Sequence, residues 1–162
     1  MMGLGDPGST SALGGALRQQ AITLTDLVVD LTEAAERARR SGRMDLSVRE
    51  RELLSSTARQ LDAVGAALQS FTATVLAGSA RIRALADNAA RSDLVIEGSV
   101  VVEARGPSRV DPVDRLRERE RLQELLNRVS AAEGKELARI ARELGRSGPA
   151  LAALSERARL GS

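Results

Sequence analysis

The side chains that could carry out chemistry in this chain are carboxylates, hydroxyls and guanidinium groups. The 162-residue sequence has no histidine and no cysteine, and Lys135 is its one lysine. A general base at neutral pH would therefore have to be Asp or Glu, and a nucleophile Ser or Thr. Most carboxylates stand beside arginines, as in the run Arg115–Arg121 (RLRERER). That pattern is typical of a solvated, charge-paired helix surface rather than of a catalytic dyad.

Known binding motifs are also missing from the sequence. A carboxylate-rich metal centre in a helical bundle typically combines Glu residues with Glu-x-x-His pairs, and histidine is absent. The glycine-rich stretches 3–8, 14–15 and 145–148 are not followed by the Gly-Lys-Ser/Thr of a phosphate-binding loop, and no expected strand precedes them. We therefore predict that the protein is not an enzyme, with no catalytic residues, no metal and no cofactor.

The charge distribution argues against a nucleic-acid partner. The formal net charge is only +2, and the isoelectric point near 10.2 reflects arginine with no group that titrates at intermediate pH. Proteins that bind nucleic acids usually carry a clustered basic face or aromatic residues that stack on bases. Acidic and basic residues alternate along this chain, and its one aromatic residue is a phenylalanine. We expect neither a nucleic acid nor a small-molecule substrate.

The element that must organise the chain is a long helix around residues 54–85. An aliphatic residue at every seventh position, with a second series between, makes an a/d stripe over about four and a half heptads. No charge occurs between Asp62 and Arg81, so other helices are expected to cover this helix on more than one side. The predicted seam residues are Leu54, Leu61, Val64, Leu68, Phe71, Val75, Ile82 and Leu85.

A preceding helix carries a matching stripe, Leu17, Leu24, Val28 and Leu31. We therefore predict an antiparallel helical hairpin over residues 9–91. Residues 1–8 are expected to be a flexible N-terminus. The first helix is expected from about Ser9, with Asp6, followed by Pro7 in the first turn, or Ser9 as its cap. The turn is placed at residues 41–45 around Gly42, and the capping box of residues 47–50 opens the second helix.

After the helical hairpin the sequence changes character. Two β-branched runs, Leu94–Ile96 and Val100–Val102, predict a β-hairpin over 92–105 with Glu97-Gly98 or Gly98-Ser99 as its turn. A linker over 106–111 ends at Asp111-Pro112, which caps a third helix over 112–145. Glycines and Pro149 are expected to end that helix, leaving a short helix or frayed tail over 146–162. The predicted fold class is therefore all-α, with a short β-hairpin between helices two and three.

Two further surfaces of the second helix are suited to contact with other helices. Beside the heptad stripe, one side of this helix carries only small residues, which let a neighbouring backbone approach closely. These residues are Ala58, Gly65, Thr72, Ser79 and Ala86. A single antiparallel helix would leave part of the uncharged centre free, and this is the predicted partner face: Ala66, Ala73, Leu76 and Ala77. Whether the covering helix is the third helix of this chain or belongs to another chain stays open at this point.

Membrane insertion and signal-directed export are not expected. Residues 1–20 lack a basic segment followed by an apolar one, so no cleaved signal peptide is predicted. The charge-free run 63–80 has the minimum length of a membrane span. Its content of Gln, Ser, Thr and Ala favours a helix covered by protein partners. The expected location is the cytoplasm, or outside the cell without a cleaved signal peptide.

Two long heptad-bearing helices, following Gly5-Asp6-Pro7-Gly8 and rich in Ala, Leu, Arg and Glu, resemble a known family. This is the WXG-motif, or early-secreted-antigen-like, helical-hairpin superfamily of actinobacterial type VII secretion. The resemblance covers residues 5–91, and residues 92–144 resemble the extensions of longer members. The turn reads Ser41-Gly42-Arg43 in place of Trp-x-Gly, and no tyrosine is present for the family's export signal.

The resemblance implies a hairpin that dimerises into a four-helix bundle, either with itself or with a related helical-hairpin protein. It also implies export, or service to an exported partner. The function expected from the sequence is therefore a non-enzymatic helical protein–protein interaction module of the type VII secretion kind. The alternative is a cytoplasmic coiled-coil scaffold or oligomerisation protein unrelated to secretion.

Overall fold

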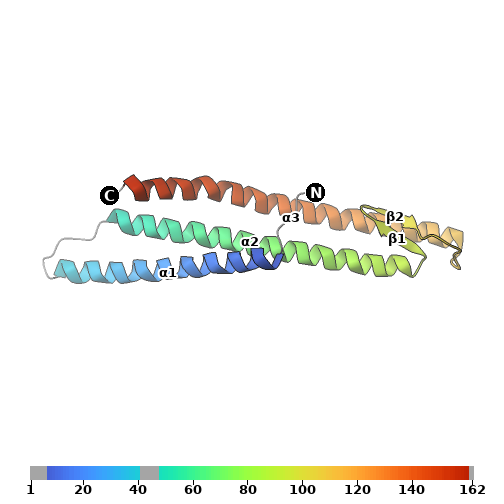
Figure 1. Cartoon of the computed structure of the whole chain (residues 1–162), viewed down its shortest axis with the longest axis horizontal. Coiled ribbons are helices and arrows are strands. Elements are labelled where there is room, and N and C mark those ends of the chain that lie inside the picture. Colours follow the sequence, from blue (N-terminus) through green and yellow to red (C-terminus); the bar gives the residue numbers. More distant parts are fainter. Residues whose placement is uncertain (1–6, 41–47, 161–162) are drawn as a thin grey trace. The chain divides into compact units, whose positions relative to one another are not determined.

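The computed structural model describes residues 7–40 and 48–160, and within these ranges the chain forms three helices and one β-hairpin (Figure 1). The all-α class and the position of the hairpin are thereby confirmed. The predicted cap at Asp6, the turn at 41–45 and the first residue of the capping box, Ser47, lie outside the described residues. The elements are α1 (Pro7–Arg40), α2 (Val48–Ala90), β1 (Leu94–Glu97), β2 (Val100–Glu103) and α3 (Pro112–Leu160).

The chain divides into two compact units, and α2 and α3 each contribute to both. Unit 1 comprises the chain up to Thr72 together with the chain from Arg139 onward, and unit 2 comprises Ala73–Ala138. Helix α1 begins at Pro7, slightly earlier than the predicted flexible segment 1–8 allows. Proline is favoured in the first turn, where its missing N–H would have no partner in any case.

In unit 1, α1 and α2 pack antiparallel with their backbones in close contact at Gly14 and Gly65. A Cβ atom added at Gly14 would lie 2.8 Å from the Gly65 carbonyl oxygen, and one added at Gly65 would lie 2.6 Å from the Gly14 carbonyl oxygen. Only glycine fits at such a distance. Along both helices the residues buried near this contact are small and follow heptad spacing: Gly14, Ala21 and Ala35 in α1, and Ala58, Gly65 and Thr72 in α2.

Helix α3 packs against the opposite side of α2 within unit 1. Ala67 is almost fully buried, and it lies two residues from Gly65, or about 200° around the helix. The groove on this side is lined by Ala63 and Ala67 of α2 and by Glu143 and Ser147 of α3. The contacts of α1 and α3 therefore lie on nearly opposite sides of α2, so the three helices of unit 1 form one layer with α2 in the middle.

The predicted end of the third helix near residue 145, with a short helix or frayed tail after it, is wrong. Helix α3 continues through Pro149 to Leu160. Proline removes one helical hydrogen bond, here to the carbonyl of Gly145. Gly145 and Pro149 are both exposed, so water can bond the freed carbonyl. On the opposite face of α3, one residue in every seven is buried across this segment, namely Ile140, Ser147 and Leu154. Because this face stays packed, the helix continues past the proline.

Unit 2 has a closed core of large side chains. It is made of Leu85 and Ala89 from α2, Leu94 and Val101 from the hairpin, and Leu122 and Leu126 from α3. An isolated two-stranded hairpin is marginally stable in water, and here one face of the hairpin is buried against both helices. The sheet therefore closes a core that α2 and α3 alone would leave open.

The hairpin has a defined turn and a defined attachment to α3. Glu97 pairs with Val100, so the turn is Gly98-Ser99, and Gly98 has a positive φ of 63°. Glycine at the first central position is typical of a type II′ turn. From α3, the Gln123 carboxamide accepts a bond from the Val101 N–H at 2.8 Å and donates to the Ser99 carbonyl at 2.9 Å. Gln123 thus satisfies part of the open edge of β2.

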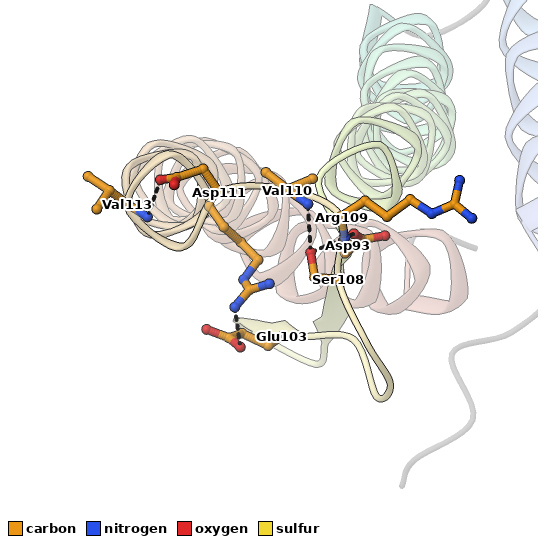
Figure 2. Close-up of polar contacts among 8 residues, drawn as sticks. Asp93, Glu103, Ser108, Arg109, Val110, Asp111 and Val113 are labelled. Atoms are coloured by element: carbon orange, nitrogen blue, oxygen red, sulfur yellow. Dashed lines mark hydrogen bonds and ion pairs between the residues drawn. The ribbon is translucent and has the colours of Figure 1, made fainter.

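The connection from β2 to α3 is held by carboxylates (Figure 2). Asp93, which has a positive φ of 53°, accepts hydrogen bonds from the Ser108 hydroxyl at 2.7 Å and the Arg109 N–H at 3.4 Å. Asp111 then caps α3 by accepting a bond from the Val113 N–H at 2.8 Å, as the sequence predicts. These contacts fix where the third helix begins.

The close contact in unit 1 yields a first prediction. Gly65→Ala should destabilise the protein by about 1–3 kcal/mol, because the added methyl group forces the backbones of α1 and α2 apart. Gly134→Ala is the matched control, since nothing lies near the added Cβ in the middle of α3, and it should stabilise the helix by about 0.5–1 kcal/mol. Urea unfolding followed by circular dichroism at 222 nm measures both. Equal effects of the two substitutions would contradict the close approach.

The core of unit 2 yields a second prediction. Leu122 is 0% exposed and Leu116, two turns earlier in α3, is 45% exposed. Leu122→Ala should therefore cost about 2–5 kcal/mol of unfolding free energy through lost burial and a cavity. Leu116→Ala should cost less than about 1 kcal/mol, as surface substitutions do. The same denaturant titrations separate the two, and a large loss for Leu116→Ala would show that this part of α3 is covered by another surface.

Candidate partner-binding face

The α1–α2 pair of unit 1 has a polar side and an apolar side. Arg18 follows Gly14 by four residues, and Gln69 follows Gly65 by four; the Arg18 guanidinium donates to Gln69 at 3.1 Å and to Asp62 at 2.9 Å. These bonds mark the polar side of the pair. Residues at the i+3 position from each glycine turn about 300° around each helix, and therefore to the other side. On that side lie the predicted seam leucines.

All the predicted seam residues of unit 1 lie toward this apolar side, and all are half-buried. We call them the leucine face: Leu17, Leu24, Val28 and Leu31 of α1, and Leu54, Leu61, Val64, Leu68 and Phe71 of α2. The other predicted seam residues belong to unit 2. Val75 and Ile82 are half-buried there, and Leu85 is part of the closed core.

The side chains of the leucine face are less buried than those of a closed hydrophobic core. Among the described residues of α1 and of the unit 1 part of α2, no apolar side chain larger than alanine is buried. In unit 2, by contrast, leucines and a valine are buried from all sides. Helices arranged as a layer shield a side chain on their broad face only laterally. The packing of α1 on α2 therefore leaves the large aliphatic side chains of these two helices partly in contact with solvent, whereas Ile140 and Leu154 of α3, which also belong to unit 1, are buried.

Two more exposed leucines extend this face along α1. Leu13 directly precedes Gly14, and Leu27 lies two heptads after Leu13; they are 55% and 43% exposed. Ile22 and Val29 are exposed to a similar degree, 54% and 51%, but by the same helical geometry they point to the polar side of the pair. Apolar residues of equal exposure thus occur on both sides of α1.

The residues of the predicted partner face are distributed differently. Ala66 is half-buried and lines the groove between α2 and α3 in unit 1. Ala73, Leu76 and Ala77 are exposed in unit 2, with Leu76 58% exposed. The sequence did not reveal this division, because heptad spacing does not specify the side of α2 on which α1 and α3 lie. Ser79 is likewise exposed, although it belongs to the side of the helix that carries only small residues.

Two observations concern the titratable groups of the described residues. No group of three or more acidic side chains in this part of the chain could hold a metal ion. The bidentate hydrogen bond from Arg121 to Glu118, with both distances at 2.8 Å, lowers the pKa of the Glu118 carboxyl. A lowered pKa keeps this carboxylate ionised at neutral pH, which is the opposite of what a general acid requires.

One described helix has the length and composition of a membrane span, namely α2, whose most apolar window has a mean hydropathy of 1.2. Only 22% of that window is buried. Core helices of water-soluble proteins can pass the same test. The polar side formed by Arg18, Asp62 and Gln69 runs along this helix, and a polar side of this kind is costly in a bilayer.

Comparisons of this chain with known protein-family models, with curated proteins and with solved structures found no match. The function is therefore inferred from the fold and from the leucine face.

Proposed function

We propose that this chain is a non-enzymatic helical interaction module that binds a second helical hairpin, in the first place a second copy of itself, through the leucine face of unit 1. The observation that supports the proposal is the difference in burial between the small residues and the leucines of α1 and α2. The small residues between α1 and α2 are buried, whereas the heptad-spaced leucines beside them are half-buried on one side of the layer.

A second copy fits this face for geometric reasons. The face consists of two antiparallel rows of heptad-spaced aliphatic residues, which is the surface that left-handed helix packing requires. A two-fold axis through the centre of the face sets each row against a row of the partner in antiparallel order. The product is a four-helix arrangement whose leucines are enclosed, as in other helical bundles.

Paired arginine substitutions test this interface. Leu13→Arg/Leu27→Arg places two charges on the leucine face, and both sites are exposed enough to leave the fold of the protomer intact. We expect the wild-type protein to be a dimer by light scattering coupled to size exclusion at micromolar concentration. The double variant should weaken dimerisation by at least about tenfold, because unpaired charges would be buried in an apolar interface.

The matched control is Ile22→Arg/Val29→Arg, which introduces the same charges on the other side of α1 and should leave the dimer unchanged. Circular dichroism establishes that both variants keep their helical content. A monomeric wild-type protein, or equal loss of association in the two variants, would contradict the proposed interface.

The type of module is a second part of the proposal. A long antiparallel hairpin with a free apolar face is what the resemblance to type VII secretion hairpin proteins implies, and we place the chain with that type as a substrate, a partner or a divergent member. Appearance of the protein in culture medium only while the secretion ATPase is intact would support this assignment. Recovery from the cytosol alone would favour the alternative, a cytoplasmic scaffold or oligomerisation protein, and would leave the dimer interface untouched.

A further inference from the structure

Unit 1 contains a second feature that the helical interface does not use. Near the start of α2, residues from all three helices line a hollow of about 760 Å³. Thr32 comes from α1, Arg157 comes from the last turn of α3, and the remaining lining residues span Val48–Arg59 of α2. The volume is in the range of sites for small organic ligands. A single bound phosphate or sulfate would occupy only part of it.

The charge of this hollow is unbalanced. Among the described residues, its lining includes one carboxylate, Glu52, and four arginines, Arg49, Arg51, Arg59 and Arg157. Several other arginines of the described surface stand in pairs with acids, such as Arg121 with Glu118 and Arg139 with Glu143. A concave site lined mainly by one sign of charge concentrates ions of the opposite sign. The lining therefore favours an anionic ligand carrying more than one negative charge.

Arg51 supplies an independent indication. Its Nε atom is buried and has no hydrogen-bond partner within residues 7–40 and 48–160, although buried N–H donors are nearly always paired. The Nε–H and a terminal N–H of arginine form the fork that binds phosphate and carboxylate oxygens in bidentate fashion. Arg51 lines the hollow, and a rotation of its side chain toward the hollow would bring this buried donor within reach of an anion.

Other groups that line the hollow would also favour the binding of an anion. Arg59 is held against its own helix by bonds to the Ser55 carbonyl and the Ser56 hydroxyl, both at 3.3 Å, so less of its side-chain freedom is lost on binding. Val48 and Arg49 belong to the first turn of α2, where the helix dipole is positive. The hollow also lies on the polar side of the α1–α2 pair, because Arg59 lines both this hollow and a neighbouring depression that contains Asp62.

We propose that this hollow binds a small polyanion with two or more phosphate groups, held by Arg51, Arg59 and Arg157. Arginine rather than lysine at these positions favours planar, two-pronged contacts to phosphate oxygens. Because the hollow and the leucine face are on different sides of the layer, binding of the anion and dimerisation are independent properties.

Calorimetric titration of the intact protein with inorganic tripolyphosphate at low salt tests the proposal, with citrate as a carboxylate comparison. We expect saturable binding that weakens as salt is raised. Arg51→Gln and Arg157→Gln should each weaken binding by about tenfold, because each removes a charge-assisted contact. Glu52→Gln should tighten binding by about threefold, because it removes the one negative charge of the lining.

The matched control is Arg83→Gln, an exposed arginine of unit 2 that changes the net charge by the same amount; its affinity should stay within about twofold of wild type. Binding without saturation, equal weakening by Arg83→Gln and Arg51→Gln, or no gain from Glu52→Gln would each overturn the proposal. Tighter binding of citrate than of tripolyphosphate would overturn the assignment to phosphate. Because Glu52→Gln has the opposite expected sign, loss of folding in an arginine variant cannot be mistaken for support.

Discussion

The close approach of α1 and α2 at Gly14 and Gly65 is the constraint from which the architecture of unit 1 follows. The two backbones can come this near only because neither residue has a Cβ. Alanines at heptad spacing, Ala21 on α1 and Ala58 on α2, continue the narrow contact. Small residues thus occupy the line between the helices, and the leucines at the i+3 and i−4 positions are displaced to one side. The heptad stripe becomes a surface of the hairpin rather than its interior.

The position of α3 adds to this effect. Its contacts with α2 in unit 1 lie about 200° from the α1 contact, so the three helices form a layer and do not close around a common axis. Unit 2 uses the same two helices differently, because the β-hairpin supplies a third wall and Leu94 and Val101 complete a core. The comparison explains why unit 2 buries leucines of α2, whereas the leucines of α1 and α2 in unit 1 are only half-buried. Partial burial of leucines is thus a consequence of backbone geometry.

Much of the fold was predictable from local sequence patterns. The predictions that failed did so for one reason, which is that they depended on packing between distant segments. Heptad spacing located α1 and α2, the β-branched runs located the hairpin, and Asp111-Pro112 located the start of α3. The stop expected near Gly145 was wrong because Ile140, Ser147 and Leu154 stay packed across it. For the candidate site, the seam was identifiable as a stripe. Its partial burial was not, because periodicity defines a face and does not say which neighbour covers it. The arginine-lined hollow brings Thr32, Arg51 and Arg157 together, residues too far apart in sequence for any motif.

The two sides of unit 1 suggest how a chain without histidine, cysteine or a metal-binding motif can still be specific. In the proposed dimer, the aliphatic rows on one side would supply affinity for another helical surface, but apolar burial alone discriminates poorly between partners. On the other side, Arg18 bonds both Asp62 and Gln69 across the α1–α2 pair, which fixes the register of the two helices and hence the spacing of the aliphatic rows. Because that spacing determines which partner rows can interdigitate, the polar side contributes to specificity at the leucine face without touching the partner.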